Sequence, residues 1–196
     1  MGNFNETKMD GVYVIEPGVF KDEKGYCTEM YNKKQFLKAG INMIFVQEFE
    51  FKSKKGMLKG IHFQKQHNQG SLIKVTKGEG FIVAVDLRYG SLTFGKWESF
   101  ILNEENKKQV YIPEGFAHGF LTLSNEAIFN YKCTEFYDPE DNGGIMWNDP
   151  DINIKWPLEK IENVILSERD KLYPRFKDLN LKKYPQIYKN KSYYCW

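Results

Sequence analysis

The sequence predicts an all-β sandwich or barrel with a few short helices. Short runs rich in Val, Ile, Phe, Tyr and Thr recur at close spacing along the chain, and Gly, Asn, Asp and Pro separate them. Helical patterns are sparse. There is no Gly-x-Gly-x-x-Gly sequence and no Walker sequence, so the chain does not predict a Rossmann or P-loop nucleotide site.

Seven runs are expected to be strands, because each combines β-branched and aromatic residues and is bounded by turn-forming residues. In chain order they are 12–15, 44–51, 72–76, 81–86, 97–102, 110–112 and 127–136. Two further stretches, 58–64 and 112–120, are also strand-like. In 58–64 the even positions share a face with His62, and Lys59 points the other way unless Gly60 marks a bulge.

One helix is expected at residues 33–39, where Gly40 follows as a left-handed cap, and one or two short turns are expected after Leu158. A chain of 196 residues can bury roughly 70% of its unfolded surface around a single core. Residues 1–176 are therefore expected to form one β domain. Residues 177–196 form a basic, tyrosine-rich C-terminal tail to which the sequence assigns no function.

Composition limits the partners and the compartment. A formal charge of +2 with scattered lysines does not favour nucleic acid. Cys27, Cys133 and Cys195 are widely spaced and odd in number, which indicates free thiols in a reducing compartment. The sequence contains no signal-peptide pattern and no run near the roughly 20 apolar residues of a membrane span. These features predict a soluble, cytoplasmic protein with no membrane partner.

Two of the three histidines lie in apolar, strand-like surroundings. His62 belongs to Lys59-Gly60-Ile61-His62-Phe63-Gln64, and His118 belongs to the stretch from Ile112 to Phe120. A lone histidine on an apolar strand is more often a satisfied core residue than a catalyst. The surrounding motifs therefore decide how these histidines are interpreted.

Those motifs occur in a fixed order along most of the chain. They are Phe20-Lys21-Asp22, Phe45-Val46-Gln47, Lys59 to Gln64, Gln69-Gly70, Val83-Ala84-Val85-Asp86-Leu87-Arg88, Thr93-Phe94-Gly95, Ile112 to Phe120, Tyr131-Lys132, Trp147-Asn148-Asp149, Ile154-Lys155-Trp156-Pro157 and Leu166-Ser167-Glu168-Arg169-Asp170. With this order and spacing, the chain resembles the dTDP-4-dehydrorhamnose 3,5-epimerase family from about Gly11 to Asp170.

The resemblance implies a cupin-type jelly roll, or double-stranded β-helix, with a cavity between its two sheets. It implies an isomerase that inverts C3, C5 or both in a 4-keto-6-deoxy sugar nucleotide, for polysaccharide biosynthesis. It also implies a homodimer that needs no metal and no cofactor. Whether the carrier is dTDP or GDP, and whether the sugar is a hexose or longer, stays open at this point.

Such an epimerisation removes a weakly acidic proton beside a ketone and returns one from the opposite face. The site therefore needs a base, an acid and a group that holds the enolate oxygen. By resemblance, His62 is the base, Asp170 is the carboxylate that orients it, and Tyr131 is the acid. Histidine suits the first role because its ordinary pKa, about 6.5, leaves it largely neutral at pH 7.

The resemblance also implies a set of substrate-binding residues: Phe20, Lys24, Glu29, Gln47, Lys59, Ser71, His118 and Tyr137. Lys24 and Lys59 stand where the family usually has arginine, so each keeps a charge for the diphosphate but loses the bidentate fork. His118 resembles the metal ligand of a second cupin motif. The usual His-x-His partner is absent, since His62 and His67 are five residues apart, so a hydrogen-bonding role is favoured.

The two sharpest departures from the family pattern are at Ser71 and Ile82. Ser71 replaces a lysine that contributes to enolate stabilisation, and Ile82 replaces a frequent aspartate. Removing one enolate-stabilising donor can lower a rate on the order of 100-fold to 1000-fold. Lys74 is a poor substitute because strand alternation places it on the face opposite Ser71. The two changes together indicate a re-engineered site.

Three alternatives stay open. A sugar-nucleotide 3,4-ketoisomerase shares the fold, but the retained Tyr131 favours epimerisation. A catalytically silent sugar-nucleotide-binding homologue is the second alternative, and Ser71 and Ile82 support it. A metal-dependent cupin oxygenase is the least favoured, because the chain offers too few ligands.

Overall fold

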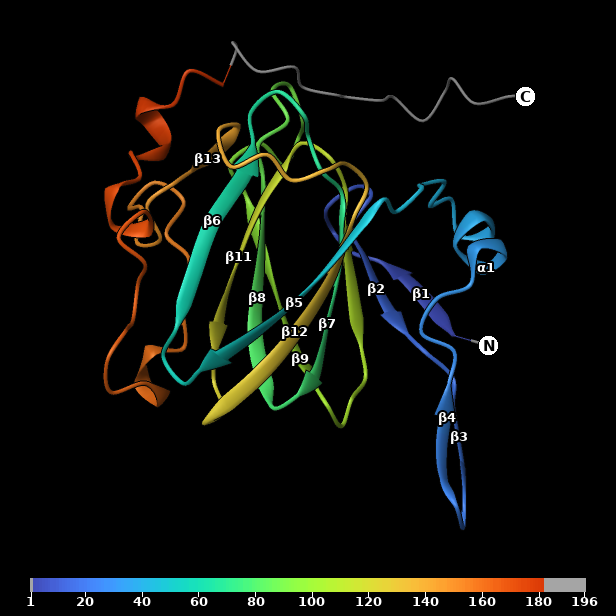
Figure 1. The fold of residues 1–196 in the computed structure, drawn as a ribbon. Helices are drawn as coiled ribbons and strands as arrows, with labels where there is room; N and C mark the ends of the chain where they lie inside the picture. The colour runs from blue at the N-terminus through green and yellow to red at the C-terminus, as the bar shows by residue number, and fades with distance from the viewer. Residues whose placement is uncertain (1, 182–196) are drawn as a thin grey trace, which may run out of the picture.

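Antiparallel strands form two main sheets in the computed structural model, which describes residues 2–181 (Figure 1). The six-stranded sheet contains, in spatial order, β1 (Asn3–Glu6), β2 (Tyr13–Glu16), β10 (Gln109–Ile112), β7 (Ser71–Lys77), β12 (Glu126–Cys133) and β5 (Gln47–Lys54). The five-stranded sheet contains β13 (Asn142–Gly144), β6 (Leu58–Gln64), β11 (Phe116–Thr122), β8 (Glu79–Asp86) and β9 (Trp97–Asn103). The all-β prediction is confirmed.

The hydrophobic pattern of β8 explains how the layers pack. Its alternate residues Ile82 and Ala84 belong to the core between the two sheets, whereas Phe81 and Val83 belong to a second core on the outer face. The C-terminal segment, orange to red in Figure 1, covers that outer face. A strand that is buried on both sides has a continuous run of apolar residues in its sequence, and β8 has such a run.

The outer core reaches into the predicted tail, because Leu181 is buried there. Three short 3-10 helices lie along this segment: η1 (Leu158–Lys160), η2 (Asp170–Leu172) and η3 (Phe176–Asp178). The rest of the predicted tail, residues 182–196, lies outside the described residues. None of the helices in the described range combines the length and hydrophobicity needed to span a bilayer.

The predicted helix is confirmed as α1 (Lys33–Lys38). The Asn32 side chain accepts hydrogen bonds from the backbone N–H groups of Lys34 and Gln35, which caps its first turn. Gly40 has φ of +85°, the left-handed conformation that ends a helix. Phe36 is buried from this helix and joins a third, smaller core cluster beneath it.

A separate hairpin, β3 (Val19–Asp22) and β4 (Gly25–Thr28), extends away from the two sheets (Figure 1). All four residues of β3 are exposed, including Phe20 at 67%. The sequence patterns missed this hairpin, β1 and β13.

Candidate active site

A cavity of about 530 Å³ lies between the two main sheets. Strands β5, β7 and β12 line it from one sheet, β6 and β11 line it from the other, and residues 167–170 close part of it. Most of the wall is apolar. The ionisable side chains that line it are Lys59, His62, His118, Tyr131, Tyr137, Arg169 and Asp170.

A bulge in β6 directs two of these side chains into the same cavity. Gly60 has φ of +117°, and the pairing register between β6 and β11 shifts beside it. A Cβ atom on Gly60 would lie 2.6 Å from the Cα atom of Gly119, so the two strands approach too closely for any other residue there. The bulge breaks the alternation, and both Lys59 and His62 line the cavity.

His62 Nε2 and Asp170 Oδ1 form a hydrogen bond. Asp170 is 2% exposed, and its other oxygen accepts a hydrogen bond of 2.7 Å from Ser167 Oγ. Burial raises the pKa of Asp170. The hydrogen bond and charge attraction from His62 and the hydrogen bond from Ser167 lower it by more, so the pKa lies below the ordinary aspartate value. Asp170 is therefore an anion that holds the proton on Nε2 and leaves Nδ1 of His62 free to accept one.

Tyr173 packs against the imidazole of His62, with ring centres 5.3 Å apart. The Tyr173 hydroxyl accepts a hydrogen bond of 2.6 Å from Asn142 Nδ2. A Cβ atom on Gly144, the β13 residue paired with His62, would lie 2.7 Å from the Tyr173 ring. Glycine at this position therefore leaves the space in which the ring packs against His62.

His118 lies directly opposite His62 in the β6–β11 pairing. Burial lowers the pKa of His118 to about 3, and His62 and Lys59 contribute to the shift. His118 is thus neutral near pH 7 and can donate or accept one hydrogen bond in the cavity. Among residues 2–181, no group of three His, Cys, Asp or Glu side chains is arranged to hold a metal ion.

Tyr131 faces the same cavity from β12, in the opposite sheet from His62. Its ring stacks on Phe49, with centres 5.2 Å apart and an interplanar angle of 28°. Burial raises the pKa of Tyr131 to about 12, so the phenol keeps its proton at neutral pH. The protonated Tyr131 phenol and the His62–Asp170 pair therefore line the cavity from two different sheets.

Lys59 extends across the cavity toward the six-stranded sheet. Its Nζ lies 4.9 Å from the ring centre of Phe51 and 5.9 Å from that of Tyr131. Burial lowers the pKa of Lys59, and the negative charge of Asp170 partly opposes the shift.

Arg169 is a lining residue that the sequence reasoning did not single out. It is exposed, and its Nη1 donates a hydrogen bond of 3.4 Å to the Tyr137 hydroxyl. The position of Arg169 directly before Asp170 is the sequence feature that could have indicated that it lines the cavity. Gln47 belongs to the same rim, because its Oε1 accepts a hydrogen bond of 2.8 Å from the backbone N–H of Tyr137.

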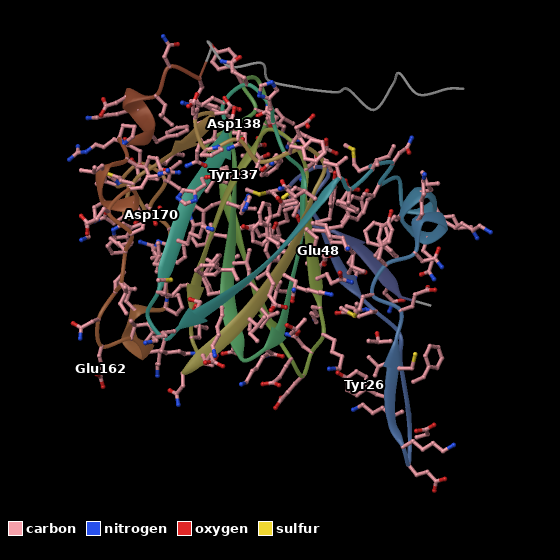
Figure 2. The ribbon with its side chains drawn as sticks, in the orientation of Figure 1. Tyr26, Glu48, Tyr137, Asp138, Glu162 and Asp170 are labelled. Carbon is pink, nitrogen blue, oxygen red and sulfur yellow. The ribbon has the colours of Figure 1, made fainter. Side chains whose placement is uncertain are left out.

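Five predicted substrate residues do not line this cavity: Gln47 and Ser71 lie on strands that form its walls, and the other three lie on segments apart from it. Phe20 and Lys24 belong to the projecting hairpin, and Figure 2 shows that Tyr26 of that hairpin lies far from Asp170 and Tyr137. The Glu29 carboxylate accepts hydrogen bonds from the side chains of Asn32 and Gln35, beside α1. Within one chain, these three residues do not meet His62.

The two sharpest departures from the family pattern, Ser71 and Ile82, are both buried. Ser71 is 1% exposed and does not line the cavity, because its short side chain ends within the packed wall. Ile82 is fully buried in the core between the sheets. Neither position brings charge to the cavity in this geometry, and the contact between Ser71 and substrate stays a prediction.

A family model described as dTDP-4-dehydrorhamnose 3,5-epimerase matches residues 6–178 of the chain. The chain is 51% identical over 168 residues to the dTDP-4-dehydrorhamnose 3,5-epimerase of Methanothermobacter thermautotrophicus. That match covers 86% of this chain and 91% of the other protein. This chain is 47% identical over 171 residues to the enzyme of the same description from Salmonella typhimurium, covering 86% and 92% of the two chains.

Solved structures share the fold over nearly the whole chain. A dTDP-6-deoxy-D-glucose-3,5-epimerase from Legionella pneumophila, in complex with dTDP-4-keto-L-rhamnose, superposes with a TM-score of 0.92 at 42% identity. That match covers 97% of this chain and all of the other. A 3'-monoepimerase from Streptomyces bikiniensis, in complex with dTDP-quinovose, superposes with a TM-score of 0.80 at 32% identity and covers 86% and 85% of the two chains.

Proposed function

The chain belongs to the dTDP-4-dehydrorhamnose 3,5-epimerase family of isomerases, and we propose that it inverts C3, C5 or both in a dTDP-linked 4-keto-6-deoxy sugar. One observation carries the proposal for this chain. The His62–Asp170 pair and the Tyr131 phenol line one cavity from opposite sheets. Inversion at carbon needs a base and an acid on opposite faces of the ring, and this arrangement supports that requirement.

The proposed proton transfers use the His62 imidazole and the Tyr131 phenol. His62 Nδ1 removes the proton from the carbon beside the ketone, and the electron pair of that C–H bond moves onto the ketone oxygen to form an enolate. Asp170 stabilises the imidazolium that results. The Tyr131 hydroxyl then gives its proton to the opposite face of the same carbon, and the ketone re-forms. Solvent must deprotonate His62 and reprotonate Tyr131 before a second carbon can react.

The apolar wall suits a sugar without a hydroxyl at C6. A methyl group packs favourably against aromatic and aliphatic side chains, whereas a buried hydroxyl without a hydrogen-bond partner is costly. The diphosphate needs cations, and Arg169 at the exposed rim offers a planar guanidinium for it. Its hydrogen bond to Tyr137 orients the side chain beside the mouth.

A homodimer accounts for the residues on the projecting hairpin. Phe20 is 67% exposed, and Tyr26, whose ring centre lies 4.1 Å from Lys107 Nζ, is 59% exposed, so the hairpin presents an exposed aromatic surface in one chain. In the proposed dimer, this hairpin lies against the cavity mouth of the second copy. Phe20 and Lys24 would then reach the nucleotide of the other subunit, as the sequence resemblance requires of them.

Deuterium uptake tests the function. Candidate 4-keto sugar nucleotides with dTDP and GDP carriers are incubated with the protein in heavy water, and the recovered sugars are analysed by mass spectrometry. One deuteron is expected for inversion at one carbon and two for inversion at both, and the dTDP carrier is expected to respond. A product with a shifted ketone would instead indicate the 3,4-ketoisomerase.

Two variants assign that activity to the cavity. His62→Ala is expected to abolish uptake, whereas His67→Ala serves as the matched control because His67 has a 63% exposed side chain and does not line the cavity. Deuterium uptake by His62→Ala at the rate of the unmodified protein would refute the proposal. Binding of a sugar nucleotide without any exchange in the unmodified protein would favour the silent-homologue alternative.

A further inference from the structure

The proposed reaction places negative charge on the ketone oxygen, and that charge needs a donor within the cavity. Ser71, where the family pattern has a lysine, is buried outside the cavity lining. Ile82 is apolar and fully buried. The group that holds the enolate oxygen in this chain must therefore come from another position.

Only two lysine or arginine side chains line the cavity among the described residues, Lys59 and Arg169. Arg169 is exposed at the rim and already donates to the Tyr137 hydroxyl. Lys59 is half-buried and lies three residues before His62 on β6. The bulge at Gly60 directs both of these β6 side chains into the cavity.

The Lys59 ammonium lies near the proposed acid and interacts with the partner of the proposed base. Its Nζ is 5.9 Å from the ring centre of Tyr131, and its charge interacts with Asp170, the partner of His62. The ring of Phe51 supports the ammonium from one side, with the centre 4.9 Å away. Within residues 2–181 its Nζ makes no hydrogen bond or ion pair with another side chain, so its N–H donors are available to a ligand.

We propose that Lys59 is the catalytic cation that stabilises the enolate oxygen, in place of a lysine at position 71. The inference rests on the proposed epimerase function. It differs from the role that the family pattern suggests for this position, which is contact with the diphosphate. A sugar ketone placed between His62 and Tyr131 brings its oxygen within reach of Lys59, whereas the diphosphate extends toward the exposed rim at Arg169.

The electrostatics of the cavity support this role. Burial lowers the pKa of Lys59, Asp170 raises it and Arg169 lowers it, while the Cys133 thiol contributes a smaller increase. His62 and Tyr137 also line the cavity, and two further titratable groups there, His118 and Tyr131, are neutral at pH 7. An ammonium with a lowered pKa is a stronger proton donor toward an enolate than an ordinary lysine is.

Replacement of the charge distinguishes the two roles. Lys59→Met keeps the length and apolar stem of the side chain, and it is expected to lower kcat for deuterium uptake on the order of 100-fold to 1000-fold. The Kd for dTDP, measured by calorimetry, is expected to stay within about threefold. Arg169→Gln is the comparison variant and is expected to raise the Kd for dTDP and KM more than it lowers kcat.

The opposite pattern would overturn the inference. One such result is that Lys59→Met keeps kcat, lowers kcat/KM and raises the Kd for dTDP by the same factor. In that case Lys59 binds the diphosphate and does not stabilise the enolate. If the unmodified protein exchanges deuterium and Lys59→Met exchanges it equally well, the inference fails while the epimerase function stands. If the unmodified protein exchanges no substrate, the proposed function itself fails.

A second measurement covers the case in which Lys59→Met does not fold. In the unmodified protein, kcat is expected to fall as pH rises through the pKa of Lys59, below the ordinary lysine value of about 10.4. Lys59→Arg keeps the charge but does not titrate in this range, so its alkaline decline should move upward. An identical decline in both proteins would exclude Lys59 as the titrating group.

Discussion

Asp170→Asn tests the mechanism most directly, because it removes one charge and changes little in shape. The Asp170 and His62 side chains are 2% and 17% exposed, so their interaction is shielded from bulk water. Two unit charges about 4 Å apart, at an effective dielectric constant of about 20, attract by about 4 kcal/mol. Loss of that stabilisation from the imidazolium-forming step corresponds to about a thousandfold lower rate.

Asparagine can add to this loss. Its amide can turn its Nδ2 toward His62 Nε2, and the proton of the imidazole then moves to Nδ1, the nitrogen that must accept one. We therefore expect kcat for deuterium uptake to fall about 1000-fold to 10,000-fold, with little change in the Kd for dTDP. Uptake is measured by mass spectrometry under single-turnover conditions.

The chain contains a matched control. Asp141 is also buried and lies 3.5 Å from a histidine, His67 Nδ1, but it is not a lining residue of the cavity. Asp141→Asn is expected to keep the rate of uptake within about threefold of the unmodified protein. If Asp170→Asn keeps more than about a tenth of that rate while it folds normally, the role of Asp170 as the partner of the base is refuted.

Three further predictions concern the acid, the core and the response to pH. Tyr131→Phe keeps the ring that stacks on Phe49 but removes the proton donor, so inverted product, measured by NMR, should fall about 100-fold to 10,000-fold while uptake from the His62 face continues. Ile82→Asp places a carboxyl group in the apolar core and should lower the free energy of unfolding by about 4 kcal/mol in urea, whereas Ile82→Val should cost about 1 kcal/mol. Burial raises the pKa of Asp86, but hydrogen bonds from Arg88 and neighbouring hydroxyls outweigh it and lower the pKa overall. Its stabilising contribution is therefore complete above the ordinary aspartate value of about 3.9 and is lost as pH falls through the lower folded value. Urea unfolding from pH 2 to pH 7 should show this loss, and the Asp86→Asn protein should show less of it.

Residue patterns within short stretches of sequence predicted which helices and strands form better than they predicted where each one begins and ends. Gly40 follows α1 and acts on the turn directly before it, so the sequence located this helix. The expected strands 44–51 and 127–136 were wrong at their ends. β5 begins at Gln47 and β12 ends at Cys133, and these two residues pair with each other. The pairing partner therefore sets where each strand stops.

For the candidate site, the sequence predicted the residues but not the contacts between them. Residue types and motifs identified His62, Tyr131 and Asp170, but no spacing rule could show that His62 and Asp170 touch across 108 residues of chain. The sequence also could not decide the direction of Lys59, which depends on the close approach of two strands at Gly60.

The sequence by itself determined the β architecture, the position of α1 and the chemistry that the motifs can perform. These depend on the preferences of single residues and of their neighbours in the chain. Only the tertiary structure decided that Lys59 enters the cavity, that Ser71 and Ile82 do not, and that Phe20 and Lys24 lie away from it. Strand register, a bulge and packing between distant segments set these positions, and none of the three is encoded in a short stretch of sequence.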